Sequence, residues 1–132
     1  MPKRRPPTAR ELAILNVLWD RGEATVREVY ERIGPRLGIV QNTVQAFLRT
    51  MEEKGLVTHR EEGRSFVYRA AVPREATGRT LLTGLLDRVF DGAMDQLVAS
   101  ALALRRPTRE ELTRLRRLIA QAEKEAKQDG KG

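Results

Sequence analysis

The hydrophobic pattern of this chain changes its period at Gly55, and that change fixes the order of its elements. Before Gly55, the apolar residues of 44–51 recur at helical spacing on one face. After it, the short β-prone runs 56–60 and 65–69 flank a glycine-containing link, which is typical of a hairpin. A lone hairpin is only marginally stable in water, so we expect it to pack against the preceding helices.

Three segments begin with the Thr-x-x-Glu spacing of a capping box, in which the Thr hydroxyl and the Glu carboxylate each accept a backbone amide of the helix start. These pairs are Thr8 with Glu11, Thr25 with Glu28, and Thr108 with Glu111. Apolar periodicity predicts helices at about 9–20, 26–33 and 41–54 before the hairpin, and at about 74–90, 94–104 and 108–127 after it. Gly34-Pro35 is expected to end the second helix. The sequence therefore predicts a mainly α fold with a small β-hairpin, in the order of a winged helix-turn-helix.

Pro73 is the expected domain boundary. Residues 1–72 form the predicted winged helix-turn-helix DNA-binding domain, 73–128 a helical dimerisation domain, and 129–132 a frayed tail. Three short helices cannot easily bury so many leucines, so we expect their apolar faces to meet a second copy of the chain. The predicted dimer interface comprises Leu81, Leu82, Leu85, Leu86, Val89, Phe90, Met94, Leu97, Val98, Leu102, Leu115, Leu118 and Ile119.

Composition restricts the class of partner and of chemistry. Lys and Arg total 25 against 18 Asp and Glu, a net charge of +7, which favours a polyanionic partner, either nucleic acid or an acidic membrane surface. Cysteine is absent and histidine occurs once, so we expect no disulfide, no metal site and no cofactor. No hydroxyl nucleophile has an obvious partnered base, so no catalytic residue is assigned and the chain is not expected to be an enzyme.

The sequence also bears on location. No apolar run approaches the roughly 20 residues needed to span a bilayer, and the first residues lack the apolar stretch of a signal peptide. We therefore expect a soluble, cytoplasmic protein with no membrane insertion. Trp19 lies on the apolar face of the first helix and is expected in the core, whereas His59 is expected at the surface.

The third helix is the candidate DNA reader. If its apolar stripe faces the first two helices, its first turns expose Asn and Gln, which pair with adenine, and Thr and Ala, which can contact a thymine methyl. The predicted base-reading residues are Gln41, Asn42, Thr43, Gln45 and Ala46. The predicted phosphate contacts are Lys3, Arg4, Arg5, Arg49, Lys54, Arg60 and Arg64.

Other interpretations remain open at this point. A polar helix face and a basic surface can serve solubility alone. The chain could also be a non-specific nucleic-acid-binding structural protein, or a protein–protein adaptor that uses its winged helix to bind a partner chain.

Several motifs resemble those of the penicillinase-repressor family (the BlaI/MecI/CopY group). Glu11-Leu12-Ala13-Ile14-Leu15-Asn16-Val17-Leu18-Trp19, followed by Thr25-Val26-Arg27-Glu28-Val29, is similar to the first two helices of that family. Asn42-Thr43-Val44 resembles the start of its recognition helix, and Lys54-Gly55-Leu56-Val57 with Phe66-Val67-Tyr68 resembles its wing. The resemblance extends from about Thr8 to Ile119.

The resemblance implies a homodimeric repressor that occupies a palindromic operator on double-stranded DNA and blocks a promoter. In the β-lactam branch of the family, a membrane-bound sensor triggers cleavage within the dimerisation domain. The matching region here is Ser100-Ala101, which lacks the Asn–Phe bond typical of that branch. The cysteine cluster of the copper-responsive branch is absent. Asn42 stands where many relatives have Lys, and Gln45 and Ala46 stand where some have Arg and Thr. The operator sequence is therefore expected to differ from theirs.

Overall fold

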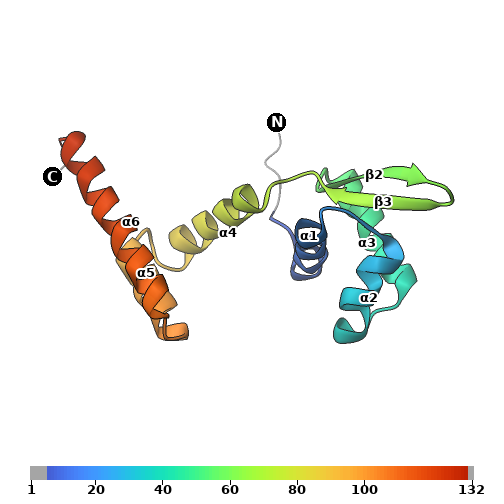
Figure 1. The fold of residues 1–132 in the computed structure, drawn as a ribbon, viewed down its shortest axis with the longest axis horizontal. Helices are drawn as coiled ribbons and strands as arrows, with labels where there is room; N and C mark the ends of the chain where they lie inside the picture. Colours follow the sequence, from blue (N-terminus) through green and yellow to red (C-terminus); the bar gives the residue numbers. More distant parts are fainter. Residues whose placement is uncertain (1–5, 131–132) are drawn as a thin grey trace. The chain divides into compact units, whose positions relative to one another are not determined.

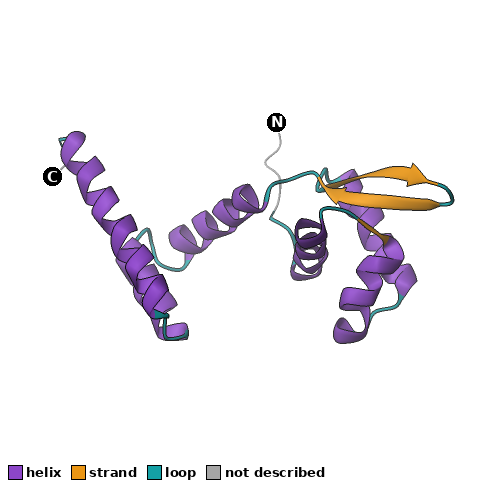
Figure 2. Ribbon diagram, in the orientation of Figure 1, coloured by secondary structure: helices purple, strands orange, loops and turns teal. Residues whose placement is uncertain are grey.

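The computed structural model describes residues 6–130, and its helices and strands follow one another as in Figures 1 and 2. The elements are α1 (Ala9–Arg21), β1 (Ala24–Thr25), α2 (Val26–Leu37), α3 (Gln41–Glu53), β2 (Val57–Glu62), β3 (Ser65–Ala70), α4 (Arg74–Arg88), α5 (Met94–Leu104) and α6 (Arg109–Gln128). The chain divides into two compact units, one ending at Gly84 and the other beginning at Leu85.

All three predicted capping boxes are formed. At the start of α1, the Glu11 amide donates to Thr8 Oγ1 at 3.2 Å, and the Thr8 amide donates to Glu11 Oε1 at 2.9 Å. The same reciprocal pair of bonds begins α2 at Thr25 and α6 at Thr108. Because each box satisfies two amides that have no partner within the helix, these starts are determined by residues three apart in the sequence.

The prediction that Gly34-Pro35 ends the second helix is wrong. The helix α2 continues through Pro35 to Leu37 and ends at Gly38, whose φ of 70° is in the left-handed region that favours glycine. Proline removes one donor, which leaves the carbonyl four residues earlier, at Glu31, without its helical partner. Glu31 and Pro35 are both exposed, so water can hydrate that carbonyl and the helix tolerates the proline.

The hairpin is confirmed, and a short strand that the sequence pattern did not predict joins it. Strands β2 and β3 are antiparallel with Glu62 opposite Ser65, and β1 pairs with the other edge of β3, giving the order β1-β3-β2. Strand β1 has only two residues, too few to show any alternation. The observed fold is mainly helical with a small sheet, as predicted.

The core of the first unit lies where α1, α2, α3 and the sheet meet. The largest fully buried side chains are Ile14, Leu15, Leu18, Val29, Ile33, Val44, Leu48, Met51 and Val57. Trp19 is only partly buried against this core, and its indole Nε1 donates to the Val72 carbonyl at 2.9 Å. That bond ties α1 to the segment that follows β3.

The first half of α4 belongs to the first unit. Thr77 is 7% exposed, and the Arg74 guanidinium lies 5.5 Å from the centre of the Trp19 ring, within the range of a cation–π contact. The first compact unit extends to Gly84 and includes these residues.

The second unit contains the end of α4 with α5 and α6. Among its described residues, 85–130, none is buried, and large apolar side chains are exposed along all three helices. Asp129 and Gly130 form a turn after α6. Across residues 6–130, no helix combines the length and the apolar character needed to cross a membrane.

Candidate nucleic-acid interface

Helix α3 is amphipathic, and its two faces meet different surroundings. Val44, Leu48 and Met51 are buried in the core, which turns the opposite face outward. Of the predicted base-reading residues, Gln41, Asn42, Gln45 and Ala46 are exposed and Thr43 is partly buried. The first turns of α3 therefore present amide side chains to solvent, as required of a helix that enters a DNA groove.

The start of α3 is left uncapped. Its N-cap residue is Val40, which offers no side-chain acceptor, in contrast to the threonines that cap α1, α2 and α6. The amides of Thr43 and Val44 bond to the Val40 carbonyl, at 3.0 and 3.2 Å. Among the described residues, the amides of Gln41 and Asn42 have no such partner. They stand at the positive end of the helix dipole and suit an anionic ligand.

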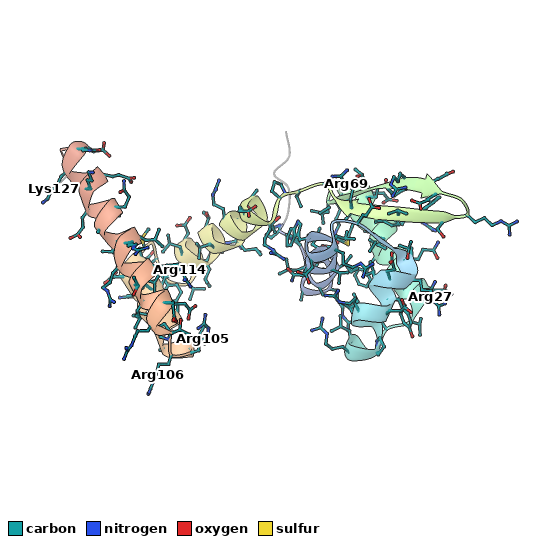
Figure 3. All side chains as sticks on the ribbon, in the orientation of Figure 1. Arg27, Arg69, Arg105, Arg106, Arg114 and Lys127 are labelled. Carbon is teal, nitrogen blue, oxygen red and sulfur yellow. The ribbon has the colours of Figure 1, made fainter. Side chains whose placement is uncertain are left out.

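A hollow joins this end of α3 to two other elements. Its lining comes from the start of α2, from α3 and from the tip of the hairpin: Thr25, Val26, Arg27, Gln41, Gln45, Arg64, Ser65 and Phe66. The arrangement of these elements is visible in Figure 1, and Arg27 is labelled in Figure 3. Two predicted base readers and one predicted phosphate contact thus share one concave surface.

The predicted phosphate contacts divide into three groups. Arg49 and Arg64 are exposed, and within the part of the chain that the structure describes neither forms an ion pair. Arg60 is held by Glu23 at 2.6 Å and by Glu62. Lys54 belongs to the same, paired group, since its Nζ lies 2.8 Å from Glu11 Oε2. The remaining group, Lys3, Arg4 and Arg5, lies outside the described residues.

The Glu11–Lys54 pair joins the first turn of α1 to the C-cap of α3. The Glu11 side chain is 3% exposed, and burial alone would raise the pKa of its carboxyl. Hydrogen bonds from Lys54 and from Thr8 together outweigh burial and lower that pKa below its ordinary value. Glu11 is therefore held as a carboxylate. Through Lys54 it anchors the C-terminal end of α3, and the N-terminal end of α3 faces the hollow.

A second contact fixes the hairpin to α3. His59 on β2 lies with Nδ1 2.7 Å from Glu52 Oε1 on α3, and its ring stacks on Phe66 with centroids 4.2 Å apart. The His59 side chain is partly buried by these contacts and remains 27% exposed. Through this contact α3 and the hairpin are held in one arrangement.

Sequence reasoning missed three residues at this surface. Val40, immediately before α3, is 63% exposed. A large apolar side chain is unfavourable both in water and at an N-cap position. Arg27 and Ser65 line the hollow from α2 and β3. Of the three, only Val40 could have been found from the sequence, because it breaks the pattern of threonine caps. Arg27 and Ser65 lie near α3 only because of tertiary packing.

The predicted dimer residues lie on α4, α5 and α6, apart from Val89 and Phe90, which follow the end of α4, and they leave apolar surface open. Those that are exposed are Leu82, Leu85, Val89, Met94, Val98, Leu102, Leu118 and Ile119, and those that are partly buried are Leu81, Leu86, Phe90, Leu97 and Leu115. In the second unit an apolar groove runs between α5 and α6, lined by Leu97, Val98 and Leu115 among others. Ser100 and Ala101 are both exposed in the middle of α5.

Comparisons with known proteins match this chain to one family of repressors. The family model described as penicillinase repressor matches residues 7–121. A penicillinase repressor from Bacillus licheniformis is 24% identical over 109 residues, which cover 83% of this chain and 85% of that protein.

Solved structures extend the comparison. The DNA-binding domain of the repressor BlaI matches with a TM-score of 0.50 and 27% identity, over 56% of this chain and 90% of that domain. A possible transcriptional regulator for arsenical resistance matches with a TM-score of 0.50 and 28% identity, over 70% of this chain and 90% of that one. The YusO protein of Bacillus subtilis shares the fold at 18% identity, with a TM-score of 0.51, over 89% of this chain and 74% of that one.

Proposed function

The chain belongs to the penicillinase repressor family, whose members are repressors rather than enzymes, and we propose that it represses transcription as a homodimer on a palindromic operator. The observation that carries this proposal is the hollow that joins the exposed, uncapped start of α3 to the hairpin tip and to α2. A duplex seated there would meet base-reading and phosphate-binding groups together.

Base recognition is assigned to α3. Gln41, Asn42 and Gln45 carry amides that can form paired hydrogen bonds with adenine in the major groove, and Thr43 and Ala46 offer methyl groups to thymine. Their exposure supports this assignment, since a reader that pointed into the protein could reach no base edge.

Phosphate binding is assigned first to Arg49 and Arg64, which are exposed and are not engaged by any carboxylate of the described chain. The free amides at the start of α3 add a neutral contribution to the same role. Lys54 and Arg60 are engaged by carboxylates, so in this proposal they hold the scaffold and contribute less to binding. Each phosphate that is neutralised adds about 0.9 to the slope of log affinity against log salt.

Dimerisation is assigned to α4, α5 and α6 and to the turn that follows α4. A chain that exposes Val89 and Leu118 at 66% each leaves apolar surface that a second copy can cover. A twofold dimer presents two reading helices in inverted orientation, which matches an inverted repeat in the operator. If the chain does not form a twofold dimer, a palindromic operator is not expected either.

For release, we propose cleavage near Ser100 and Ala101, triggered by a membrane-bound sensor. Both residues are exposed but helical, so a protease would have to unwind α5 locally before cutting. Intact mass measurement of the chain before and after derepression of its promoter tests this step. Two fragments divided within α5 support it, and an intact chain on a derepressed promoter contradicts it.

The test of the whole proposal is selection of bound DNA from a random pool by the full chain. We expect an inverted repeat with half-sites spaced by whole helical turns of DNA. The matched variants are Gln45→Ala, which should alter the recovered repeat, and Gln128→Ala, an exposed glutamine at the end of α6, which should leave it unchanged.

The rival functions give different results in the same experiment. Bound DNA with no shared motif and only a salt-dependent affinity would identify a non-specific nucleic-acid-binding protein. Failure to retain any DNA at low salt would favour an adaptor that binds protein through its winged helix. Either result would overturn the proposed operator.

A further inference from the structure

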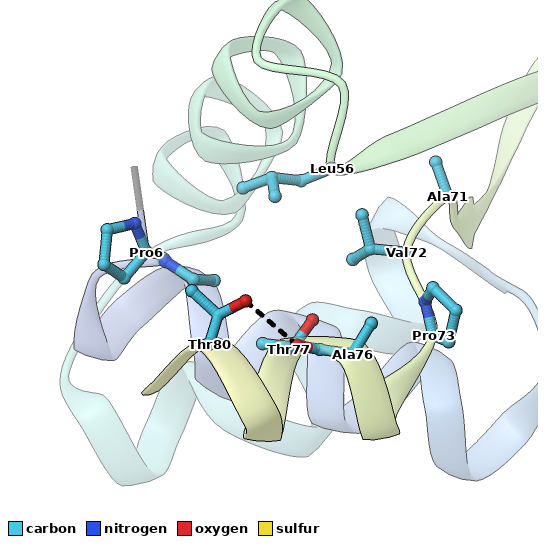
Figure 4. A pocket seen from close by; sticks show the side chains of 9 residues that line it. Pro6, Leu56, Ala71, Val72, Pro73, Ala76, Thr77 and Thr80 are labelled. Atoms are coloured by element: carbon cyan, nitrogen blue, oxygen red, sulfur yellow. Dashed lines mark hydrogen bonds between the residues drawn. The ribbon is translucent and has the colours of Figure 1, made fainter. Parts of the chain in front are cut away.

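A small apolar pocket lies at the first half of α4, within the first compact unit. Figure 4 shows it from close by. Its lining comes from four stretches of chain: Pro6 and Pro7 before α1, Leu56 between α3 and β2, Ala71, Val72 and Pro73 after β3, and Ala76, Thr77 and Thr80 on α4. Its volume is about 220 Å³. An occupant would therefore contact the winged-helix body and α4 at once.

One polar group in this pocket has no partner. Thr77 is 7% exposed, and among the described residues its hydroxyl makes no hydrogen bond. Figure 4 shows the Thr77 oxygen on the side of the pocket. Three other helical threonines behave differently, since Thr80, Thr83 and Thr113 each donate to the carbonyl four residues earlier, at 2.8–3.1 Å. No side-chain oxygen or nitrogen of the described residues is both fully buried and unbonded, so solvent reaches the Thr77 hydroxyl. A polar group of an occupant can therefore bond to this hydroxyl in place of water.

The rest of the lining defines what can bind. Within residues 6–130, no charged side chain lines the pocket, and none of these residues offers a charged ligand an opposite charge in return for its lost hydration. The walls are prolines, alanines, a leucine and a valine, which favour an apolar body. The Thr80 hydroxyl is already bonded to the Ala76 carbonyl, as the dashed line in Figure 4 marks. Thr77 is thus left as the polar contact.

We propose that this pocket is a binding site for a small neutral molecule, one ring in size, that carries a single hydroxyl or carbonyl group bonded to Thr77. An apolar protein cavity of about 150 Å³ accommodates benzene, so about 220 Å³ holds one six-membered ring with a small substituent. Ordered water is a poorer occupant, because a buried water needs two to four polar partners and these walls are largely apolar. The proposal does not depend on the proposed DNA site, since the two sites share no lining residue.

Cyclohexanol is the probe, because it is neutral, matches the size of the pocket and does not absorb near the indole band. Amide NMR spectra of the full chain are followed as cyclohexanol is added, and cyclohexylammonium of the same shape serves as the charged control. We expect saturable shifts at Leu56 and at residues 71–80, with a dissociation constant on the order of 1 mM for so few heavy atoms. The fluorescence of Trp19, bonded to Val72 of the lining, should change along the same curve.

Three variants test the atoms involved. Thr77→Val keeps the shape and removes the hydroxyl, so cyclohexanol should bind about three- to ten-fold more weakly. Thr83→Val removes a hydroxyl of α4 that does not line the pocket, and binding should not change. Ala76→Leu adds bulk at an exposed position of the lining and should abolish binding without unfolding the chain.

Three results would overturn the proposal. One is the absence of saturable shifts up to about 50 mM cyclohexanol, far above the expected dissociation constant. Another is equal affinity for cyclohexylammonium, which would contradict a neutral site. The third is unchanged binding to both Thr77→Val and Ala76→Leu, which would place the probe elsewhere.

Discussion

Replacing Lys54 by methionine separates two roles for this side chain, one in the scaffold and one on DNA. In the free protein its Nζ lies 2.8 Å from Glu11 Oε2, and the Glu11 side chain is 3% exposed. Methionine keeps the apolar stem and removes the charge. Glu11 then keeps the Thr8 amide as a partner but loses the bond from Lys54.

The expected cost follows from burial. A hydrogen bond to a charged group contributes about 1.5–3 kcal/mol, and because the Lys54 side chain is 48% exposed, solvent screening places the loss at the lower end, about 1.5 kcal/mol. With a urea dependence of about 1–3 kcal/mol per molar, the unfolding midpoint should fall by about 0.5–1.5 M. Trp19, the single tryptophan of the chain, reports unfolding of the first unit, and Lys124→Met is the matched control on the exposed face of α6.

The stability contributed by the Glu11–Lys54 pair should depend on pH. The folded pKa of Glu11 is lowered below 4.5, so the stability from its pairing is present above pH 4.5 and is lost as pH falls through the folded pKa. The difference in free energy of unfolding between the native chain and Lys54→Met should therefore be largest at neutral pH and should decrease below pH 4.5. An unchanged midpoint, together with a salt slope of DNA binding lower by about 0.9, would instead show that Lys54 contacts a phosphate.

The other predictions concern the DNA and dimer surfaces and the start of α6. Gln45→Ala should cost about 1–3 kcal/mol of operator binding and relax preference at one base pair, and an unchanged half-site profile would remove Gln45 from the readers. Arg64→Ala should weaken binding to all sequences and lower the salt slope by about 0.9, whereas a sequence-dependent loss would contradict a phosphate contact. Leu85→Asp should give monomers in sedimentation velocity, and an intact dimer would exclude Leu85 from the interface. The Arg105 guanidinium, with the Thr108 amide, lowers the pKa of Glu111 to about 2, so α6 should lose helicity as pH falls from 4.5 to 2 and this carboxylate is protonated. In Glu111→Gln, circular dichroism should show a smaller loss over the same pH range.

Several features of the fold were predictable because they depend on residues close in sequence. A capping box joins residues three apart, and the stripe from Val44 to Met51 repeats every three or four residues, so both can be found by spacing alone. The exposure of Gln41 and Gln45 followed directly, because a helix whose stripe is buried must turn its other face outward.

Other features depended on contacts that only the folded chain makes. Lys54 and Glu11 are 43 residues apart, and Arg60 and Glu23 are 37 apart, so no local pattern could reveal that these charges are already paired. The strand β1 exists only because β3 lies beside it, and α2 continues past Pro35 at a position where Glu31 and Pro35 are both exposed.

The sequence by itself determined the order of the elements, the helix starts and the outward face of α3, because local hydrogen bonding and apolar periodicity act within a few residues. Tertiary structure decided which basic side chains remain available for a ligand, how the hairpin is fixed to α3 through His59, and that a hydroxyl of α4 faces an apolar pocket. Each of these depends on which distant segments come into contact, and the burial they share sets the strength of the interaction.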